Sequence, residues 1–298
     1  MTNKTVIIIA GPTAVGKTRF AIELAKKLNT SVISADSRQC FRELNIGVAK
    51  PSPQELEKVR HYFINSHSIH EPMNAVIYEQ YSLDAVKEIF KHSDYAVMAG
   101  GTGLYIKAFA EGIDLIPDID PAIRKALLDE YETSGIEKLQ ELVQKEDPLY
   151  YATGELKNPH RLIRALEVIR GTGKSIREYQ SGKQKERPFR IIKFMLDEKR
   201  VVLYENINKR VDEMMNKGLL KEASSLIAYR DLPPLQTVGY TELFDYFDGN
   251  STLEEAVELI KRNTRRYAKR QLTWFRKDPE FLPIPPTDSS LVLKQLGL

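Results

Sequence analysis

The chain has 298 residues, 42% of them hydrophobic, and a formal net charge of only +3 at pH 7. This length and composition suffice for a full hydrophobic core in one large domain or two modest ones, and they exclude a disordered or fibrous protein. The N-terminal segment lacks a signal-peptide pattern and no apolar run approaches the roughly 18 residues of a membrane span, so we expect an intracellular, cytoplasmic protein that does not associate with membranes.

The chain contains a single cysteine, Cys40. An internal disulfide and a metal site made of several cysteines are therefore excluded. We interpret Cys40 as a small, partly buried hydrophobic residue rather than as a reactive thiol.

The first recognisable element is a glycine-rich loop between an apolar strand and an amphipathic helix. Residues 11–18 match the phosphate-binding pattern G-x-x-x-x-G-K-[ST] and read Gly11-Pro12-Thr13-Ala14-Val15-Gly16-Lys17-Thr18. A β-branched run over 6–10 precedes the loop, and apolar residues recur at helical spacing after it. In such a loop, backbone N–H groups surround phosphate oxygens, Lys17 supplies a cation and the Thr18 hydroxyl can ligate Mg²⁺. The sequence therefore predicts a site for a di- or triphosphate.

The next elements continue an alternation of strands and helices. Residues 31–35 form a second short apolar run, which we expect to lie beside the first strand, and Asp36 stands at its carboxyl end. A helix is predicted from Leu83, with the preceding serine as its N-cap. A strand over 95–99 then ends in a second glycine-rich turn, residues 100–103. This alternation predicts a parallel, doubly wound sheet.

Three polar or glycine-rich segments should meet at the carboxyl edge of this sheet, where open α/β sheets place their ligands: the phosphate loop, residues 36–39 and residues 100–103. We expect them to outline one pocket. There, Asp36 is either a base or a carboxylate that orders Mg²⁺, unless it only caps a turn. Thr102 either presents its hydroxyl to the pocket or serves the turn alone. Because the strand over 95–99 ends in glycine and not in an acidic pair, the pattern favours a transferase over a hydrolytic motor or switch.

A stretch without strand patterns interrupts the alternation. Helix boundaries inside it are indicated by Asp120-Pro121, Gly135 and Asn158-Pro159. We therefore predict an α/β fold with a P-loop nucleoside-triphosphate-hydrolase-like parallel sheet core, residues 1–115 and 188–298, and a helical insertion domain, residues 116–187.

After the insertion, a strand is predicted over 189–196, and helical patterns follow near 203–216, 220–228 and 252–277.

Basic side chains are concentrated in two places. The predicted helix near 252–277 contains eight Lys or Arg and no acid from Lys261 to Lys277, with aromatic residues between them. Such a run is typical either of a solvated helix face or of a surface for a nucleic-acid backbone. In the insertion, Arg161 and Arg164 lie one helical turn apart and fit either surface ion pairs or phosphate binding.

Eight groups of residues occur in a fixed order along the chain. They are residues 11–18, Asp36-Ser37 with Gln39, Gly47 with Ala49-Lys50-Pro51, Gly100-Gly101-Thr102-Gly103-Leu104-Tyr105, Asn158-Pro159 with Arg161, Arg164-Ala165-Leu166-Glu167-Val168, Gly239-Tyr240 with Glu242, and Thr264-Arg265 with Tyr267-Ala268-Lys269-Arg270-Gln271 and Thr273-Trp274-Phe275-Arg276. Together they resemble the tRNA dimethylallyltransferase family, the tRNA isopentenyltransferases. The chain departs from the family's usual residues at Phe41, Glu43-Leu44-Asn45 and His61-Tyr62-Phe63-Ile64.

The resemblance implies a prenyltransferase that moves a dimethylallyl group from dimethylallyl diphosphate to N6 of the adenosine on the 3′ side of the anticodon, position 37. It implies Mg²⁺ as cofactor, the tRNA anticodon stem-loop as partner and, we expect, a monomer. By resemblance, Asp36 accepts the proton of the amine, Thr102 lies near the reacting centre, and Arg210 joins Lys17 at the diphosphate. The chemistry agrees, because charge grows on the leaving diphosphate and the weakly nucleophilic adenine amine needs a proton acceptor.

A base taken out of the stack of an anticodon loop needs aromatic and cationic side chains around its entry. The residues that we predict to contact tRNA come from both predicted domains. They are Asp36, Ser37, Arg38, Gln39, Thr102, Arg124, His160, Arg161, Leu162, Ile163, Arg164, Gln236, Thr237, Val238, Gly239, Tyr240, Thr241, Lys269, Arg270, Gln271, Leu272, Thr273, Trp274, Phe275 and Arg276.

Two other functions fit parts of the pattern. A small-molecule kinase would also use a phosphate loop followed by an aspartate after the second strand. A nucleotide-gated RNA-binding protein would explain the basic helix without a role for Asp36. Only the prenyltransferase predicts that dimethylallyl diphosphate is used in preference to ATP.

Overall fold

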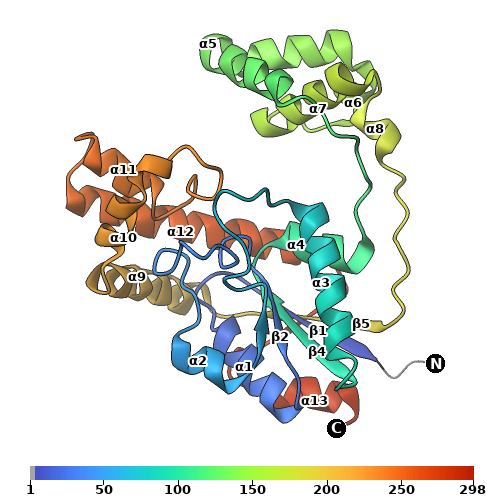
Figure 1. Ribbon diagram of the computed structural model, residues 1–298, viewed down its shortest axis with the longest axis vertical. Helices are drawn as coiled ribbons and strands as arrows, with labels where there is room; N and C mark the ends of the chain where they lie inside the picture. Colours follow the sequence, from blue (N-terminus) through green and yellow to red (C-terminus); the bar gives the residue numbers. More distant parts are fainter. Residues whose placement is uncertain (1–3) are drawn as a thin grey trace. The chain divides into compact units, whose positions relative to one another are not determined.

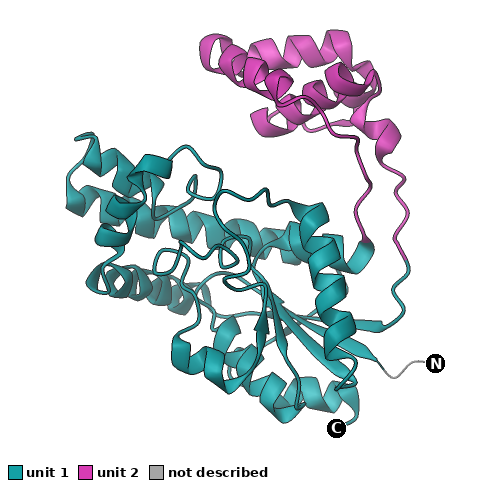
Figure 2. Cartoon of the chain, in the orientation of Figure 1, with its two compact units in different colours: residues 1–111, 186–298 teal, residues 112–185 magenta. Residues whose placement is uncertain are grey.

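The computed structural model describes residues 4–298 and divides the chain into two compact units (Figure 2). Unit 1 comprises Met1–Glu111 and Glu186–Leu298, and unit 2 comprises Gly112–Lys185. Among residues 4–298, no helix combines the length and the apolar character that crossing a membrane requires.

In the described part of the chain, six parallel strands form one sheet at the centre of unit 1, in the order β3-β2-β4-β1-β5-β6 (Figure 1). The strands are β1 (Thr5–Ala10), β2 (Val32–Ala35), β3 (His61–Tyr62), β4 (Tyr95–Gly100), β5 (Arg190–Leu196) and β6 (Phe281–Ile284). On β1, Ile7 is in register with Val97 of β4 and Ile192 of β5. Every residue of β1 is buried, as expected for a parallel strand covered on both faces. The predicted parallel α/β core is therefore confirmed.

The order of the strands corrects one prediction. We expected the second strand to lie beside the first, but β4 lies between β1 and β2. The connection through the first helix carries the chain past one strand position, and β4 fills that position later. The turn that follows β4 consequently lies between the phosphate loop and Asp36.

Helices cover both faces of the sheet in unit 1. On one face, Ile7 and Ile9 pack with Phe20 and Leu24 of the first helix in a core that also includes Ile207. The helices are α1 (Lys17–Lys27), α2 (Pro53–Lys58), α3 (Ala75–Ile89), α4 (Gly103–Glu111), α9 (Arg200–Asn216), α10 (Leu219–Ser225), the 3₁₀ helix η1 (Ile227–Tyr229), α11 (Thr241–Phe247), α12 (Leu253–Phe275) and α13 (Ser290–Leu296). Five of these elements, α2, α11, α13, β3 and β6, were not expected from the sequence. These elements are short, so their periodicity is weak.

Helix α3 begins earlier than we predicted. Its N-cap is Asn74, whose side chain accepts hydrogen bonds from Val76 N and Ile77 N at 2.9 Å each. Ser82, the predicted cap, is fully buried inside the helix and donates to Glu79 O. Aromatic and β-branched residues dominate the first turns, where propensity is a weak guide, and burial of Tyr78 at 0% exposure decides the outcome.

Unit 2 is entirely helical in its described residues. Its helices are α5 (Pro121–Glu146), α6 (Pro148–Thr153), α7 (Pro159–Thr172) and α8 (Ile176–Tyr179). Asp120, Asp147 and Asn158 cap the first three, each followed by a proline in the first turn. Leu127 and Leu139 of α5 pack with Leu162 and Leu166 of α7 in a separate hydrophobic core. Unit 2 therefore has a core of its own.

Candidate active site

The phosphate loop begins at the carboxyl end of β1 and ends in the first turn of α1. Gly16 has φ +97°, a conformation that L side chains rarely adopt, and it precedes Lys17 at the start of α1. The Lys17 ammonium donates to Pro12 O at 2.7 Å and thereby closes the loop. The pKa of Lys17 is lowered to about 7, mainly by burial; the Asp36 carboxylate opposes this shift, and the Arg210 guanidinium adds to it. An anionic ligand bound in the loop would therefore stabilise the charged form of Lys17.

Asp36 follows β2 and is oriented by its own turn. Its Oδ1 accepts hydrogen bonds from Arg38 N at 2.9 Å and Gln39 N at 3.4 Å. The sequence folds this way because a short aspartate side chain readily bonds to the backbone two residues later. The carboxylate lines the cavities described below. Asp36 therefore both shapes its turn and faces open space.

The glycine-rich turn after β4 is attached to the Asp36 segment. A Cβ on Gly100 would lie 2.1 Å from Ala35 O, so only glycine fits there. Thr102 N donates to Ala35 O at 3.1 Å, and Thr102 Oγ1 accepts from Ser37 N at 3.1 Å. These bonds hold the Thr102 side chain next to the Asp36 turn, as the shared sheet edge predicted.

Helix α12 supplies the side chains that lie over this edge. Tyr267 shares a side-chain hydrogen bond with Thr102, and burial together with the Asp36 charge raises the pKa of the Tyr267 hydroxyl to about 12. The tyrosine is therefore neutral at physiological pH. Gln271, one turn further along, is only 6% exposed. Arg266, Lys269 and Arg270 of the same helix are exposed.

Two cavities in unit 1 meet at this place. The smaller one has a volume of about 400 Å³ and is lined by the phosphate loop, Asp36 and residues of α9. The larger one has a volume of about 560 Å³ and contains Val48, Val211, Met214 and Ile260 as apolar wall. Both cavities are lined by Thr13, Asp36, Val48, Arg210 and Tyr267. A ligand with an anionic and an apolar part can therefore occupy the two cavities together.

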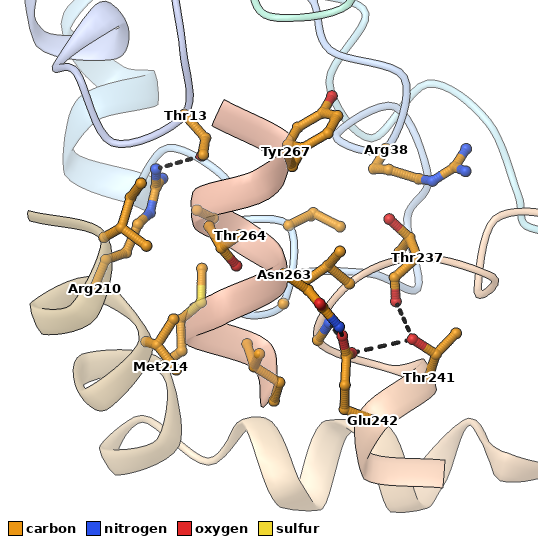
Figure 3. Close-up of a pocket in the computed structure, with 18 of the residues that line it drawn as sticks. Thr13, Arg38, Arg210, Met214, Thr237, Thr241, Glu242, Asn263, Thr264 and Tyr267 are labelled. Atoms are coloured by element: carbon orange, nitrogen blue, oxygen red, sulfur yellow. Dashed lines mark hydrogen bonds between the residues drawn. The ribbon is translucent and has the colours of Figure 1, made fainter. Parts of the chain in front are cut away.

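Figure 3 shows how the larger cavity is closed on two sides. Arg210 on α9 points toward Thr13 and donates to its Oγ1 at 3.4 Å, while Tyr267 extends from α12 beside it. At the other end, Glu242 accepts from Asn263 Nδ2 at 2.8 Å and from Thr241 Oγ1 at 3.1 Å. A diphosphate in the smaller cavity would meet Lys17 and Arg210 from two different elements.

Most of the predicted contacts from the segment 236–241 line the larger cavity. These are Gln236, Thr237, Val238, Gly239 and Thr241, together with Ser37, Arg38 and Arg270 from other segments. Tyr240 is fully buried, and its hydroxyl donates to Glu222 Oε1 at 2.6 Å. Gln39 lines the smaller cavity.

The other predicted residues of α12 divide by exposure. Lys269, Thr273, Trp274 and Arg276 are exposed, whereas Leu272 is half-buried and Phe275 is fully buried. A surface for a partner can therefore use the first group, while the side chain of Phe275 serves the core.

In unit 2, the predicted contacts divide in the same way. His160 and Arg161 are exposed, but Leu162 and Ile163 are 0% exposed and belong to the core of the unit. Arg124 and Arg164 both pair with Glu167, at 3.1 Å each. Arg164 therefore forms an ion pair with Glu167, which was one of its two predicted roles.

Sequence reasoning missed two carboxylates that hold the cavity walls. Glu222 of α10 accepts from Ile46 N at 2.8 Å, from Gly47 N at 2.9 Å and from the Tyr240 hydroxyl. Glu242 is 5% exposed and also accepts from Gly239 N at 2.8 Å. Glu242 stands in one of the family-like groups, which was a signal for it; Glu222 stands outside them, and only the fold brings it to the loop.

The smaller cavity offers few protein oxygens that could bind a metal. Residues 4–298 contain no group of three or more His, Cys, Asp or Glu that could hold a metal ion. Thr18 and Asp36 both line the smaller cavity and offer oxygen donors. This donor set fits Mg²⁺, which is typically bound by few protein ligands together with water and phosphate oxygens.

A parallel sheet with a phosphate loop at its carboxyl edge defines an α/β protein of the P-loop class. Within that class, the sequence model of the IPP transferase family matches residues 39–278. A tRNA dimethylallyltransferase of Cytophaga hutchinsonii is 49% identical over 278 residues, which cover 93% of this chain and 91% of that protein. One of Christiangramia forsetii is 48% identical over 274 residues, covering 92% of this chain and 91% of that protein. The chain belongs to the IPP transferase family.

Solved structures agree with this membership. The tRNA isopentenylpyrophosphate transferase of Bacillus halodurans has a TM-score of 0.71 at 36% identity, covering 98% of this chain and 94% of that one. A eukaryotic dimethylallyltransferase acting on tRNA has a TM-score of 0.76 at 27% identity, covering 96% of this chain and 75% of that one. The family resemblance noted in the sequence is thereby confirmed.

Proposed function

We propose that this chain is a tRNA dimethylallyltransferase. It transfers the dimethylallyl group of dimethylallyl diphosphate to N6 of the adenosine at position 37 of tRNA, 3′ of the anticodon, giving N6-(dimethylallyl)adenosine and diphosphate. The carrying observation is that the phosphate-loop cavity and the larger cavity share Asp36 and Arg210. An anionic leaving group and an incoming base can thus meet at one carboxylate. The relatives' names supply the substrates.

The leaving group is held by cations. Backbone N–H groups in the part of the loop from Ala14 to Thr18 and the Lys17 ammonium bind the diphosphate, and Arg210 reaches it from α9. As the allylic C–O bond breaks, the electron pair remains on the diphosphate. Because negative charge grows there, these groups stabilise the transition state more strongly than the ground state. Thr18 would hold Mg²⁺, which supplies further neutralisation of the diphosphate when bound.

The acceptor is activated by a carboxylate. The amine of adenine is a weak nucleophile because its lone pair is delocalised into the ring. As the N6–C bond forms, Asp36 accepts the N6 proton, for which it must lie within about 2.6–3.2 Å. Thr102, held by Ser37 N, keeps the acceptor-side turn next to this carboxylate.

The tRNA is proposed to contact exposed cationic and aromatic side chains. In unit 1 the exposed ones are Lys269, Arg270, Trp274 and Arg276, with the half-buried Arg38 at the larger cavity, and in unit 2 they are His160 and Arg161. Phosphate contacts of this kind position the nucleic acid, while a few cavity residues select the base. Because its substrate is tRNA, we propose that the protein works in the cytoplasm. We also propose that it is a monomer.

The experiment mixes the protein with labelled dimethylallyl diphosphate, unmodified tRNA and Mg²⁺. Label should appear on adenosine 37 of the tRNA, and a tRNA with another base at that position should remain unlabelled. ATP in place of dimethylallyl diphosphate tests the kinase alternative: ATP consumption with no label on tRNA would contradict the proposal.

A further inference from the structure

We propose that Gln271 is a positioning residue that fixes the phosphate loop relative to the acceptor-side turn; this rests on the prenyl transfer proposed above. Its side-chain amide bonds to the backbone of both segments at once. Gln271 Oε1 accepts from Thr13 N at 2.8 Å, and Gln271 Nε2 donates to Gly101 O at 2.8 Å. We expected Gln271 to contact tRNA, but the side chain is 6% exposed, both ends of its amide are engaged, and it faces inward.

The geometry requires an amide at this position. One partner is a donor and the other an acceptor, and a neutral amide is the side chain that satisfies both. Gly101 matches this requirement, because a Cβ on it would lie 2.1 Å from Gln271 Nε2. The missing side chain of Gly101 lets the amide reach the backbone. Gln271 and Gly101 thus form a fitted pair between α12 and the turn.

The two bonded segments belong to the two halves of the reaction. Thr13 belongs to the phosphate loop, and its hydroxyl accepts from Arg210, so it lies on the diphosphate side. Gly101 is followed by Thr102, which accepts from Ser37 N next to Asp36 and so lies on the acceptor side. The Gln271 side chain therefore sets the distance between the phosphate loop and the turn that contains Gly101. Displacement by about 1 Å of a reacting group costs on the order of 100-fold in rate.

The first test replaces Gln271 by methionine, which keeps the volume and removes both hydrogen bonds. We expect kcat for prenyl transfer to fall by about 10- to 100-fold, because both buried backbone groups lose their partner and the two segments lose their spacing. The dissociation constant for tRNA should stay unchanged, since the exposed cations of α12 remain. Gln80→Met on α3, where the glutamine is exposed, is the matched control and should leave both quantities unchanged.

Gln271→Glu gives a pH signature within a single folded protein. A protonated glutamic acid can replace the amide, since it donates to Gly101 O and accepts from Thr13 N, whereas the carboxylate has no donor and faces a carbonyl oxygen. Burial raises the pKa of such a carboxyl, so the ratio of variant to wild-type kcat should rise as pH falls from about 8 to about 6. The charged or titratable groups around the cavity are Lys17, Arg19, Asp36, Glu55, Lys209, Arg210, Glu213 and Tyr267. They are present in both proteins, but the introduced carboxylate favours the charged form of Lys17, an effect that would raise the ratio as pH rises and is therefore opposite to the expected trend.

The outcomes separate this inference from the proposed function. If wild-type protein transfers no label to tRNA, the proposed function fails. If wild type is active, a wild-type kcat for Gln271→Met, or a Gln271→Glu ratio that does not change with pH, overturns the positioning role. A fall in kcat for Gln271→Met at unchanged tRNA affinity, together with recovery of Gln271→Glu at low pH, supports it.

Discussion

The two cavities differ in how the chain builds them. The smaller one takes much of its wall from one continuous segment, the phosphate loop and the first turn of α1. The larger one collects residues from segments around 36–38, 47–49, 207–214, 236–242 and 260–270. The first cavity depends on local backbone geometry, and the second depends on tertiary bonds such as those of Glu222 and Glu242. Changes in the two should therefore have different consequences.

The largest effect is expected where the cavities meet. Asp36→Ala should lower the rate of prenyl transfer by about 100- to 10,000-fold, because the N6 proton loses its acceptor. Single-turnover transfer of labelled dimethylallyl to tRNA measures it, and tRNA binding should persist. Asp84→Ala, an exposed aspartate on α3, is the control. Near wild-type transfer by the Asp36 variant would contradict the base assignment.

Lys17→Met tests the smaller cavity alone. It should reduce kcat/KM for dimethylallyl diphosphate by about 100- to 1,000-fold, since a preorganised charge at the leaving group is lost. tRNA affinity should be unaffected, and Lys26→Met at the exposed end of α1 should behave as wild type. A Lys17 variant that loses tRNA binding to the same degree would show that the cavities are not separable.

The lowered pKa of Lys17 predicts a proton uptake. The pKa is about 7 in the free protein, so near pH 8 much of the ammonium has lost its proton. A bound diphosphate favours the charged form and raises that pKa again, so binding takes up protons, and affinity falls as pH rises through about 7. Calorimetry in buffers of different ionisation enthalpy measures the uptake, which should vanish in Lys17→Met.

Glu222→Ala tests the larger cavity. It leaves Ile46 N, Gly47 N and the Tyr240 hydroxyl without their acceptor, and we expect a loss of about 1–3 kcal/mol in the free energy of unfolding. The rate of prenyl transfer should fall because the loop around Gly47 is displaced, whereas diphosphate binding should be retained. Urea unfolding gives the stability, and Glu205→Ala on the exposed face of α9 serves for comparison. Unchanged stability would mean that Glu222 does not hold this wall.

The smallest effect is expected on the basic face of α12. Lys269→Ala should weaken tRNA binding modestly and reduce the slope of log affinity against log salt by about one. Binding measured over a salt series tests it, with Lys294→Ala on α13 as control. An affinity indifferent to ionic strength in wild type would exclude phosphate contacts at this face.

Some elements could not be predicted because their signals are not local. The start of α3 depends on the burial of Tyr78 against the sheet, where its hydroxyl donates to Ser34 O. The position of β4 between β1 and β2 follows from long-range pairing. Similarly, Gln271 looked like part of an exposed basic helix, and only the packing of α12 on the sheet edge turned its amide toward the backbone of Thr13 and Gly101.

By itself, the sequence determined the phosphate loop, the alternation of strands and helices, the helical insertion and the family, because each is written in short patterns of residue type and spacing. Tertiary structure alone decided the strand order, the larger cavity and the roles of Glu222, Glu242 and Gln271. These depend on hydrogen bonds between segments far apart in the chain, and which buried donors and acceptors must pair is settled only when the chain is folded.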